Sequence, residues 1–414
     1  MSHFALINSL ILRKLNKKRV FVQSFCLAVT VTALFVLLVD PRQFSANVPI
    51  TIPQLANRFD TNSSNNFASG INEERVKQEL SGYTGYTIRR LGLKPIPLVS
   101  PLEPSDNKEP VVNDVNSFHY PIDIHPWHQK FKCPYWTNTS SNATANNNQT
   151  LLIVVISAAA HSAQRNLIRK TWGGPNLLEV DWIQLIFLVG STPDEDIVLK
   201  ERLKKENAQY EDLVQVNVVD TYANLTLKSV ALLHWTHGHC PGAQSVLKCD
   251  DDIYINLNGL INILSKEQFK PINRLYGLGI AQDRPQRDPS NKYYISRAIW
   301  PWNMYPPFLS GGGYLMGRDT IQPLLSAAQT TPFFPLEDVF LTGICARKAH
   351  ITSVSSRRIY ERFIPKKLDS CFVRSTAMWQ TQSKIQFLQS HDIVSVIYRR
   401  HLPCRTACKY LGIC

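Results

Sequence analysis

Three consecutive carboxylates, Asp250-Asp251-Asp252, are the residues best suited to chemistry in this sequence. They directly follow SVLKC, which is typical of a short buried strand. A divalent cation would offset their mutual repulsion, because Mg²⁺ and Mn²⁺ prefer oxygen ligands. Such a metal could bind a nucleotide diphosphate and neutralise the charge that develops as a bond to phosphate breaks. An isolated acidic triplet is more often a solvated loop, so its place at a strand end is what favours a metal.

Two arginines, Arg165 and Arg169, lie four residues apart in RNLIRKTWG. On a helix they share one face, while Ile168 and Trp172 share another. Guanidinium groups suit phosphate oxygens, which favours a role beside a diphosphate. The alternative is an amphipathic helix whose Trp packs on a sheet and whose arginines are solvated.

The segment DTYANLTLK follows another predicted strand. We expect Asn224 or Thr226 to cap the helix that comes next. Lys228 falls in the first turn of that helix, where its side chain could reach a phosphate. The capping role is the structural alternative to any part in ligand binding.

Two later segments combine glycines or acids with a proline. In YPPFLSGGGYLMG the glycines Gly311, Gly312 and Gly313 permit a tight turn or the close approach of backbone to a ligand. In FFPLEDVFLTGIC, Glu337 and Asp338 come where a helix could begin, and acids at a helix start are commonly caps.

The elements that must position these residues alternate between strand and helix. Apolar β-branched runs begin at residues 151, 183, 212, 245 and 275, and helical stretches separate them. This alternation predicts an α/β fold with a mostly parallel, Rossmann-like sheet flanked by helices. Ligands of such sheets bind beyond the carboxyl ends of the strands. The chain has neither a dinucleotide-binding glycine motif nor a P-loop motif, so other ligands are favoured.

The composition of the 414-residue chain fits one folded domain with additional segments. Its net charge of +13 suits nucleic acid, an acidic membrane or an anionic small molecule equally well. Because no RNA-binding motif and no zinc-finger spacing occurs, we expect no nucleic-acid partner. Eight of the nine cysteines lie after residue 130 and could pair in an oxidising compartment, with disulfides the default for the cluster Cys404, Cys408 and Cys414.

Residues 20–39 form an uncharged run long enough to cross a bilayer as a helix. Basic residues precede the run and an acid follows it, which predicts a cytosolic tail at 1–19 and a luminal remainder. A cleaved signal peptide is the alternative, but the run is longer than its usual apolar core and ends in a poor cleavage site.

The next stretch, residues 40–148, is rich in Pro, Asn, Ser and charge, and we interpret it as a luminal stem. Parts of FHYPIDIHPWHQKFKCPYW are expected to pack on the following domain, which we place at 149–414 with a Cys-containing C-terminal extension. Five sequons predict glycosylation at Asn62, Asn138, Asn142, Asn148 and Asn224.

Taken together and in order, six segments resemble the β-1,3-glycosyltransferases of glycosyltransferase family 31. They are RNLIRKTWG, FLVG, DTYANLTLK, KCDDDIYIN, YPPFLSGGGYLMG and EDVFLTGIC, and they cover about half of the chain. The resemblance implies a GT-A fold, a UDP-sugar donor, Mn²⁺ and inversion at the sugar carbon. It also implies a Golgi membrane protein of the single-pass type II kind.

The resemblance assigns roles residue by residue. Asp252 becomes the direct metal ligand, with Asp250 beside it, while Asp250 and Asp251 lie near the nucleotide or sugar. Asp338 takes the position of the catalytic base. The remaining donor-binding assignments are Ser157, Arg165, Arg169, Gly312 and Gly313.

One departure from the family pattern concerns a further histidine metal ligand, which the family has some forty residues after EDV. Here SCFVRSTAMWQTQ keeps the Trp, Trp379, without that histidine. His350 and His391 stand at irregular spacing, and packing or surface roles suit both better. This departure implies weaker metal binding, or a coordination shell completed by water.

These features predict an inverting β-1,3-galactosyltransferase that transfers galactose from UDP-galactose to the 3-hydroxyl of a terminal GlcNAc- or GalNAc-type sugar. The acceptor glycan would be carried on a glycolipid or a glycoprotein. Alternatives are transfer of N-acetylglucosamine from UDP-GlcNAc, a luminal glycan-binding or partner subunit without turnover, and a metal-dependent hydrolase.

Overall fold

The computed structural model describes residues 83–85, 87, 88, 93, 111–124, 133, 150–174, 182–192, 195–265, 272–365 and 368–404. The predicted tail, the predicted membrane span at 20–39 and most of the predicted stem lie outside this set, as do Asn62, Asn138, Asn142 and Asn148. Within the described set, no helix combines the length and the apolar character needed to cross a membrane.

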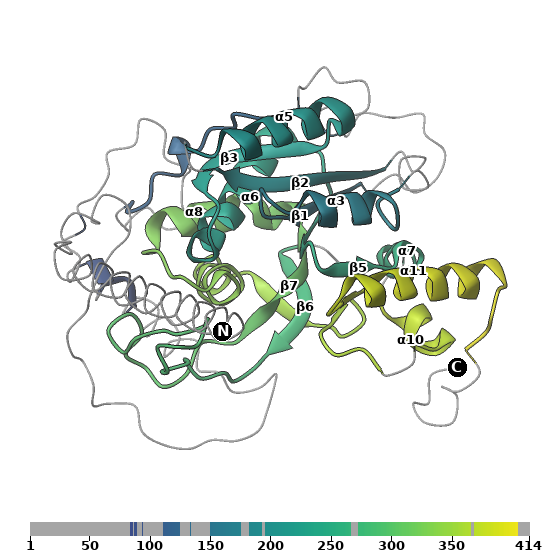
Figure 1. The fold of residues 1–414 in the computed structure, drawn as a ribbon. Coiled ribbons are helices and arrows are strands. Elements are labelled where there is room, and N and C mark those ends of the chain that lie inside the picture. The colour runs from purple at the N-terminus through teal and green to yellow at the C-terminus, as the bar shows by residue number, and fades with distance from the viewer. Residues whose placement is uncertain are drawn as a thin grey trace, which may run out of the picture. The chain divides into compact units, whose positions relative to one another are not determined.

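A seven-stranded sheet with the order β3-β2-β1-β4-β7-β6-β8 runs through the domain (Figure 1). Its strands are β1 (Leu151–Ile156), β2 (Ile183–Ser191), β3 (Leu213–Val219), β4 (Ser245–Asp250), β6 (Arg274–Ile280), β7 (Phe308–Gly317) and β8 (Thr352–Ser355). Neighbours pair in parallel except where β7 meets β4 and β6. The predicted α/β class is confirmed, and the sheet is mixed because β7 runs against the other strands.

Helices cover both faces of this sheet (Figure 1). One hydrophobic core joins the sheet to α6 (Leu225–His239), α8 (Arg318–Thr330) and the π-helix η4 (Val339–Cys345). The other joins it to α3 (Ser162–Arg169), α5 (Ile197–Tyr210), α7 (Leu257–Leu264) and α11 (Lys384–Arg399). All of β1 is buried, with alternate residues in the two cores, which explains its unbroken apolar sequence.

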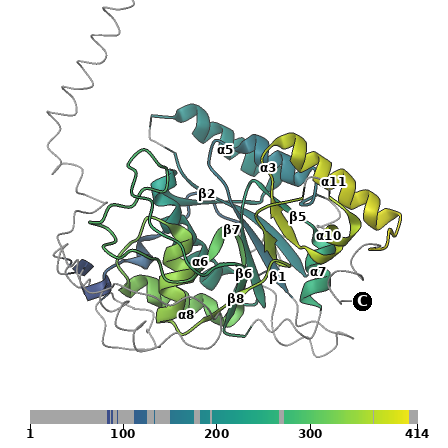
Figure 2. The same ribbon diagram turned by 90° about the horizontal axis from the view of Figure 1, so that it is seen from below.

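A second, three-stranded sheet lies beside the acidic triplet. Its strands are β5 (Ile253–Ile255), β10 (Met378–Gln380) and β9 (Tyr360–Glu361), in the order β5-β10-β9. Viewed from below, α11 and the short helix α10 (Ser370–Ser375) lie beside β5 (Figure 2). Trp379 in β10 is buried and donates from Nε1 to Ser390 Oγ on α11. The triplet therefore lies at the junction of β4, which belongs to the main sheet, and β5, which belongs to the second sheet.

The glycines of YPPFLSGGGYLMG do not form the expected tight turn, because they lie inside β7. A Cβ atom at Gly312 would collide with the Tyr360 hydroxyl. A Cβ atom at Gly313 would come within 2.9 Å of the Met378 side chain. These glycines thus let the second sheet approach β7 closely, whereas the sequence predicted a tight turn or a close approach to a ligand.

Residues 111–124 pack against the domain, although the sequence assigns them to the stem. The Gln215 amide of β3 donates to the Ile122 carbonyl at 2.7 Å, and the Tyr120 hydroxyl donates to the Ala231 carbonyl of α6 at 3.0 Å. The predicted boundary at 148/149 is therefore too late, because apolar and aromatic side chains before it belong to the core. The expectation that FHYPIDIHPW packs on the domain is confirmed for its described part.

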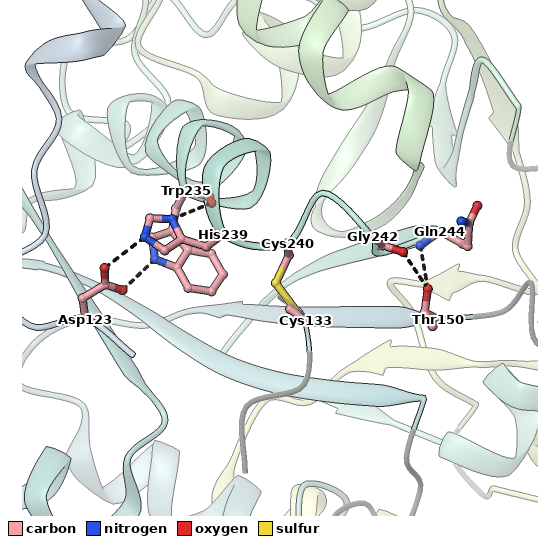
Figure 3. Close-up of a disulfide and its surroundings, with 8 residues drawn as sticks. All are labelled: Asp123, Cys133, Thr150, Trp235, His239, Cys240, Gly242 and Gln244. Carbon is pink, nitrogen blue, oxygen red and sulfur yellow. Dashed lines mark hydrogen bonds and ion pairs between the residues drawn. A yellow bond between two sulfur atoms is a disulfide. The ribbon is translucent and has the colours of Figure 1, made fainter. Parts of the chain in front are cut away.

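The end of α6 fixes this segment through one carboxylate and one disulfide (Figure 3). Asp123 accepts a hydrogen bond from Trp235 Nε1 at 2.8 Å and lies 3.1 Å from His239 Nε2. Although burial alone would lower the pKa of His239, its hydrogen bond and charge interaction with Asp123 raise it. The disulfide Cys133–Cys240 lies next to this cluster.

A second disulfide joins Cys371 to Cys404, while Cys249 and Cys345 are buried free thiols. The expectation that all eight late cysteines could pair is therefore wrong for these two, which pack inside the cores. Cys408 and Cys414 lie outside the described residues.

Asp123→Asn should lower the free energy of unfolding by about 1 kcal/mol at pH 5.5 and by much less at pH 8.5. The asparagine retains an acceptor for Trp235 but loses the charge that favours protonated His239. Because the folded pKa of His239 is raised, the ion pair stabilises the fold fully below the unfolded pKa and ceases to do so above the folded one. Urea unfolding at the two pH values measures this, and equal losses at both would contradict it.

Candidate active site

The acidic triplet lies where the strand order of the main sheet reverses. The order runs outward from β1 through β2 to β3, whereas β4 pairs with the opposite side of β1. The ends of β1 and β4 therefore flank the position at which open α/β sheets bind ligands. Ser157, just after β1, donates from Oγ to Asp251 Oδ2 at 2.8 Å. The structure thus brings together two residues that the sequence placed at the site.

His161 also belongs to this cluster, and the sequence reading missed it. Its Nδ1 lies 2.9 Å from Asp251 Oδ2, and its side chain is 53% exposed. His161 lies immediately before α3, in the segment that follows β1. Its position between a strand and a helix is the sequence feature that could have identified it. Asp251 is therefore oriented by two side chains from the segment that follows β1.

Asp252 has the free oxygen that a cation site requires. Its Oδ2 accepts from Gln380 Nε2 at 2.9 Å, and its carbonyl accepts from the Thr381 amide at 3.0 Å. Its Oδ1 is buried and has no hydrogen-bond partner among the described residues. A buried oxygen without a donor is costly unless a ligand or ion completes it, so Asp252 fits the predicted metal.

Few protein ligands surround that oxygen. Within the described parts of the chain, no group of three or more His, Cys, Asp or Glu side chains is arranged to hold a metal. His391 instead packs against Tyr254, with its Nδ1 3.2 Å from the tyrosine hydroxyl. A cation bound at Asp252 and Asp250 would thus take its other ligands from substrate or water.

Lys248, another residue that the sequence reading passed over, joins the triplet to the EDV segment. Its Nζ is completely buried and donates to Asp250 Oδ1 at 2.7 Å and to the Gly311 carbonyl at 2.5 Å. It also lies 3.5 Å from Glu337 Oε2. Burial alone would lower the pKa of Lys248, but Asp250 and Glu337 raise it, so the side chain stays cationic.

Asp338 is held with both carboxylate oxygens on backbone amides. Oδ2 accepts from the Gly311 amide at 3.1 Å, and Oδ1 accepts from the Val339 amide at 2.9 Å. The second contact is the helix cap that the sequence allowed. Burial and the neighbouring charge of Glu337 nevertheless raise the pKa of Asp338 to about 6. A carboxylate with such a pKa is suited to accept a proton near neutral pH.

The pKa values of two carboxyl groups of the triplet, Asp250 and Asp252, are raised. Burial, opposed by Lys248 and reinforced by Asp252 and Glu337, raises the pKa of Asp250 to about 7. The pKa of Asp252 is raised as well, with burial as the largest cause. A bound cation would reverse both shifts, because positive charge favours the carboxylate form. The arrangement can therefore hold a cation and an anionic ligand beside one proton acceptor.

Comparison with known proteins places one region of the chain in a family. The galactosyltransferase family matches residues 163–357, which contain both the triplet and Asp338. Residues 163–357 belong to the galactosyltransferase family.

Two relatives show how far this similarity extends. A mouse (Mus musculus) acetylgalactosaminyl-O-glycosyl-glycoprotein beta-1,3-N-acetylglucosaminyltransferase is 36% identical over 205 residues, covering 48% of this chain and 52% of the relative. Human (Homo sapiens) beta-1,3-galactosyltransferase 5 is 32% identical over 189 residues, covering 46% and 60%. The match thus spans little more than half the length of these relatives.

Among solved structures, a glycosyltransferase involved in the glycosylation of the major capsid of PBCV-1 aligns over 58% of this chain and 98% of its own. The TM-score is 0.31 and the identity 10%.

The two arginines of the galactosyltransferase region do not face the predicted diphosphate position with free donors. Arg165 is fully buried, and all five of its N–H groups donate to Glu206, Ser157 Oγ and the carbonyls of Ala158 and Ala159. The alternative prediction, that the arginines are solvated, is also wrong, because Arg165 is buried and the Arg169 side chain is only 9% exposed. The contacts of Arg165 instead fix the segment after β1, and through Ser157 they fix Asp251.

Arg169 anchors a different part of the same network. It donates to both carboxylate oxygens of Asp212, at 2.8 and 2.7 Å, and to Glu206 at 2.8 Å. Although burial opposes its charge, Asp212 and Glu206 raise the pKa of Arg169. This arginine joins α3 to α5 and to the residue before β3. Among the described residues, it makes no hydrogen bond to the segment that follows β1.

The DTYANLTLK residues also have structural partners in the galactosyltransferase domain. Lys228 Nζ donates to the Ser157 carbonyl and to Asp220 Oδ1, both at 2.8 Å, so two of its three N–H groups already have protein acceptors. Asn224 precedes α6 without a side-chain cap, because its Nδ2 donates to the Val219 carbonyl. Thr226 is buried and donates to the Phe334 carbonyl. Asn224 of this sequon is half-buried and ends the short helix Tyr222–Asn224 before α6.

Lys248→Met should lower the free energy of unfolding by about 3 to 5 kcal/mol at pH 8, because it leaves buried carboxylates unpaired. The loss should shrink as pH falls towards about 7, the pKa of Asp250 beside Lys248, because without the lysine Asp250 takes up a proton at higher pH. Urea denaturation across this range is the measurement, with the exposed Lys204→Met as the matched control. A loss below 1 kcal/mol at pH 8 would show that Lys248 does not balance the acids.

Proposed function

We propose that this chain is an inverting β-1,3-galactosyltransferase that transfers galactose from UDP-galactose to the 3-hydroxyl of a terminal GlcNAc- or GalNAc-type sugar. The acceptor glycan is carried on a glycolipid or a glycoprotein. The observation that carries the proposal is one buried network. It joins Asp250 through Lys248 and Gly311 to Asp338, the proposed proton acceptor. Asp252, whose Oδ1 has no hydrogen-bond partner among the described residues, lies two residues after Asp250 in the chain. The family of residues 163–357 supports the same chemistry.

In this proposal the Asp338 carboxylate takes the proton of the acceptor's 3-hydroxyl as that oxygen bonds to the anomeric carbon of the donor sugar. The bond from this carbon to the diphosphate oxygen breaks in the same displacement, and its electron pair leaves with UDP. One displacement from the opposite face converts an α-linked donor into a β-linked product. Asp252 and Asp250 would hold a manganese ion, which would supply charge neutralisation for the leaving diphosphate.

The buried network positions these groups before substrate arrives. Lys248 holds Asp250 and the Gly311 carbonyl, and the Gly311 amide in turn holds Asp338. Ser157 and His161 orient Asp251, which we assign to the nucleotide or sugar of the donor. Preorganised groups of this kind lower the barrier because they need no rearrangement during the reaction.

A second candidate is transfer of N-acetylglucosamine from UDP-GlcNAc. It is favoured by the 36% identity to a mouse beta-1,3-N-acetylglucosaminyltransferase. Incubation of the purified protein with each UDP-sugar, Mn²⁺ and a panel of acceptor glycans distinguishes the two donors. Absence of transfer from every donor would reject both and favour a binding subunit, whereas release of free sugar without acceptor would indicate a hydrolase.

We also propose that the enzyme is a single-pass type II protein of the Golgi membrane, anchored by residues 20–39 with its catalytic domain in the lumen. The two disulfides support an oxidising compartment. Protease protection of the domain in sealed membrane vesicles tests this orientation, and digestion without detergent would contradict it.

Asp338→Asn should reduce kcat by about 10² to 10⁴-fold, because the amide keeps the size of the side chain but cannot accept the proton. UDP binding should be unchanged, since Asp338 does not hold the diphosphate. Steady-state kinetics and calorimetry measure the two effects, with the exposed Asp288→Asn as control. Full activity of Asp338→Asn would remove the base from the mechanism.

The wild-type kcat/KM should fall close to tenfold per unit as pH drops below about 6, the pKa of Asp338 in the free enzyme. A protonated base cannot take up the acceptor's proton, so the loss lies on the acidic side. A profile that stays flat to pH 5 would contradict this assignment.

A further inference from the structure

Residues 331–335 follow α8 and lead to Asp338, the proposed base, without forming a helix or a strand. Their sequence is TPFFP, and proline cannot donate a backbone hydrogen bond. Buried carbonyl groups in such a segment need donors from side chains, because an unpaired buried carbonyl costs stability. The donors that this segment finds therefore help to set the position of Asp338.

Four successive carbonyl groups, those of residues 331–334, accept hydrogen bonds from side chains. Asn113 Nδ2 donates to the first of them at 2.6 Å, and Thr226 Oγ1 donates to the last at 2.9 Å. The Tyr83 hydroxyl lies 3.3 and 3.1 Å from the two in the middle, which share its one proton. Three side chains from distant parts of the chain thus hold the backbone that precedes Asp338.

Two of these three donors come from residues 40–148, which the sequence assigns to the stem. Tyr83 is buried, with 1% of its surface exposed. Asn113 is also fixed to the end of α8, because its amide donates to the Gln329 carbonyl at 3.0 Å and its Nδ2 donates to the Ala328 carbonyl at 2.7 Å. Stem residues are therefore built into the backbone support of the site.

The ring of Tyr83 packs against aromatic side chains from two segments. Its centroid lies 6.2 Å from that of Phe334 and 5.3 Å from that of Trp300. Trp300 contacts Tyr305 at 5.7 Å, and Tyr305 contacts Phe308, the first residue of β7, at 6.4 Å. Tyr83 thus links the segment that follows α8 to the start of β7.

The two elements that Tyr83 links meet at the proposed base. Gly311 of β7 donates from its amide to Asp338 Oδ2 at 3.1 Å. A Cβ atom at Gly311 would lie 3.3 Å from that same oxygen, so the strand and the carboxylate are closely apposed. Misplacement of a reacting group by about 1 Å can cost about 10²-fold in rate. The support of residues 331–335 therefore bears directly on catalysis by Asp338.

We propose that Tyr83 and Asn113 are positioning residues for Asp338, so that part of the predicted stem is needed for turnover. Both act through the backbone of residues 331–335, and Tyr83 also acts through its aromatic link to β7. Neither acts by contact with substrate. The proposal rests on the proposed transferase function, because it concerns the base of that reaction.

Tyr83→Phe removes the hydroxyl and keeps the ring, so the fold should be retained. We expect the melting temperature to fall by about 2 to 4 °C, because carbonyl groups lose a donor. We expect kcat to fall by about 10- to 100-fold, since Asp338 is no longer held in place. The affinity for UDP with Mn²⁺, measured by calorimetry, should stay unchanged. A wild-type kcat in Tyr83→Phe would overturn the assignment of Tyr83.

Tyr120→Phe is the matched control for a purely structural effect. The Tyr120 hydroxyl comes from the same predicted stem and also donates to a backbone carbonyl, that of Ala231 on α6, at 3.0 Å. Its removal should lower the melting temperature by a similar amount and leave kcat unchanged. Equal losses of kcat in Tyr83→Phe and Tyr120→Phe would show a general loss of stability and overturn the proposal.

Asn113→Ala tests the second positioning residue. It removes the Nδ2 donor to the Thr331 carbonyl, so it should give the same lower kcat with unchanged UDP affinity. A wild-type kcat in Asn113→Ala would overturn the assignment of Asn113.

Hydrogen exchange distinguishes failure of this proposal from failure of the proposed function. Peptides that cover residues 331–345 should exchange about tenfold faster in Tyr83→Phe than in the wild type, and Tyr120→Phe should leave them unchanged. That result, with no sugar transfer by the wild type, would reject the transferase function but support the hold of Tyr83 on the Asp338 segment. Unchanged exchange of these peptides in Tyr83→Phe would overturn the positioning role whatever the activity.

Discussion

A single buried cation, the ammonium group of Lys248, allows the acids of this site to lie together. It neutralises Asp250 and approaches Glu337, while it also binds the carbonyl of Gly311. Without it, the junction of β4, β7 and η4 would bring carboxylates together in an environment that penalises their charge. The high pKa of both Asp250 and Asp338 shows that the compensation is incomplete, which leaves the site ready for a further positive charge.

Arg165 and Arg169, both on α3, also pair with acidic side chains. Arg165 binds the segment after β1 and reaches Asp251 through Ser157, whereas Arg169 joins α3 to Asp212. Both share Glu206, and their charges and hydrogen bonds lower its pKa although burial opposes this. Arg165 thus supports Asp251 through Ser157, whereas Arg169 fixes α3 to α5 and to the residue before β3.

The sequence predicted those parts of the fold that local pattern controls. Continuous apolar runs identified β1, β2, β3, β4 and β6, because strands buried on both faces need apolar side chains throughout. The position of the triplet after β4 and of Ser157 after β1 followed from the same pattern. Contacts that depend on distant elements were not accessible in this way.

Lys248 is an example, because a lysine inside SVLKC gives no local sign of facing Gly311, 63 residues away. Gly312 and Gly313 suggested a turn or a close approach to a ligand, because the sequence gives no sign that Tyr360 and Met378 in another sheet need the space beside them. The partners of Arg165 and Arg169 likewise come from α5 and from the residue before β3. Long-range charge pairing therefore sets the limit on what the sequence could predict here.

We propose that Asp252 and Asp250 hold a cation that binds the donor's diphosphate beside Asp338. Titration calorimetry of UDP, with and without Mn²⁺, on the wild type and Asp252→Asn tests it most directly. We expect UDP binding by the wild type to require Mn²⁺. We expect Asp252→Asn to weaken UDP binding by at least about tenfold. Equal UDP affinity with and without Mn²⁺, or in the wild type and Asp252→Asn, would contradict it.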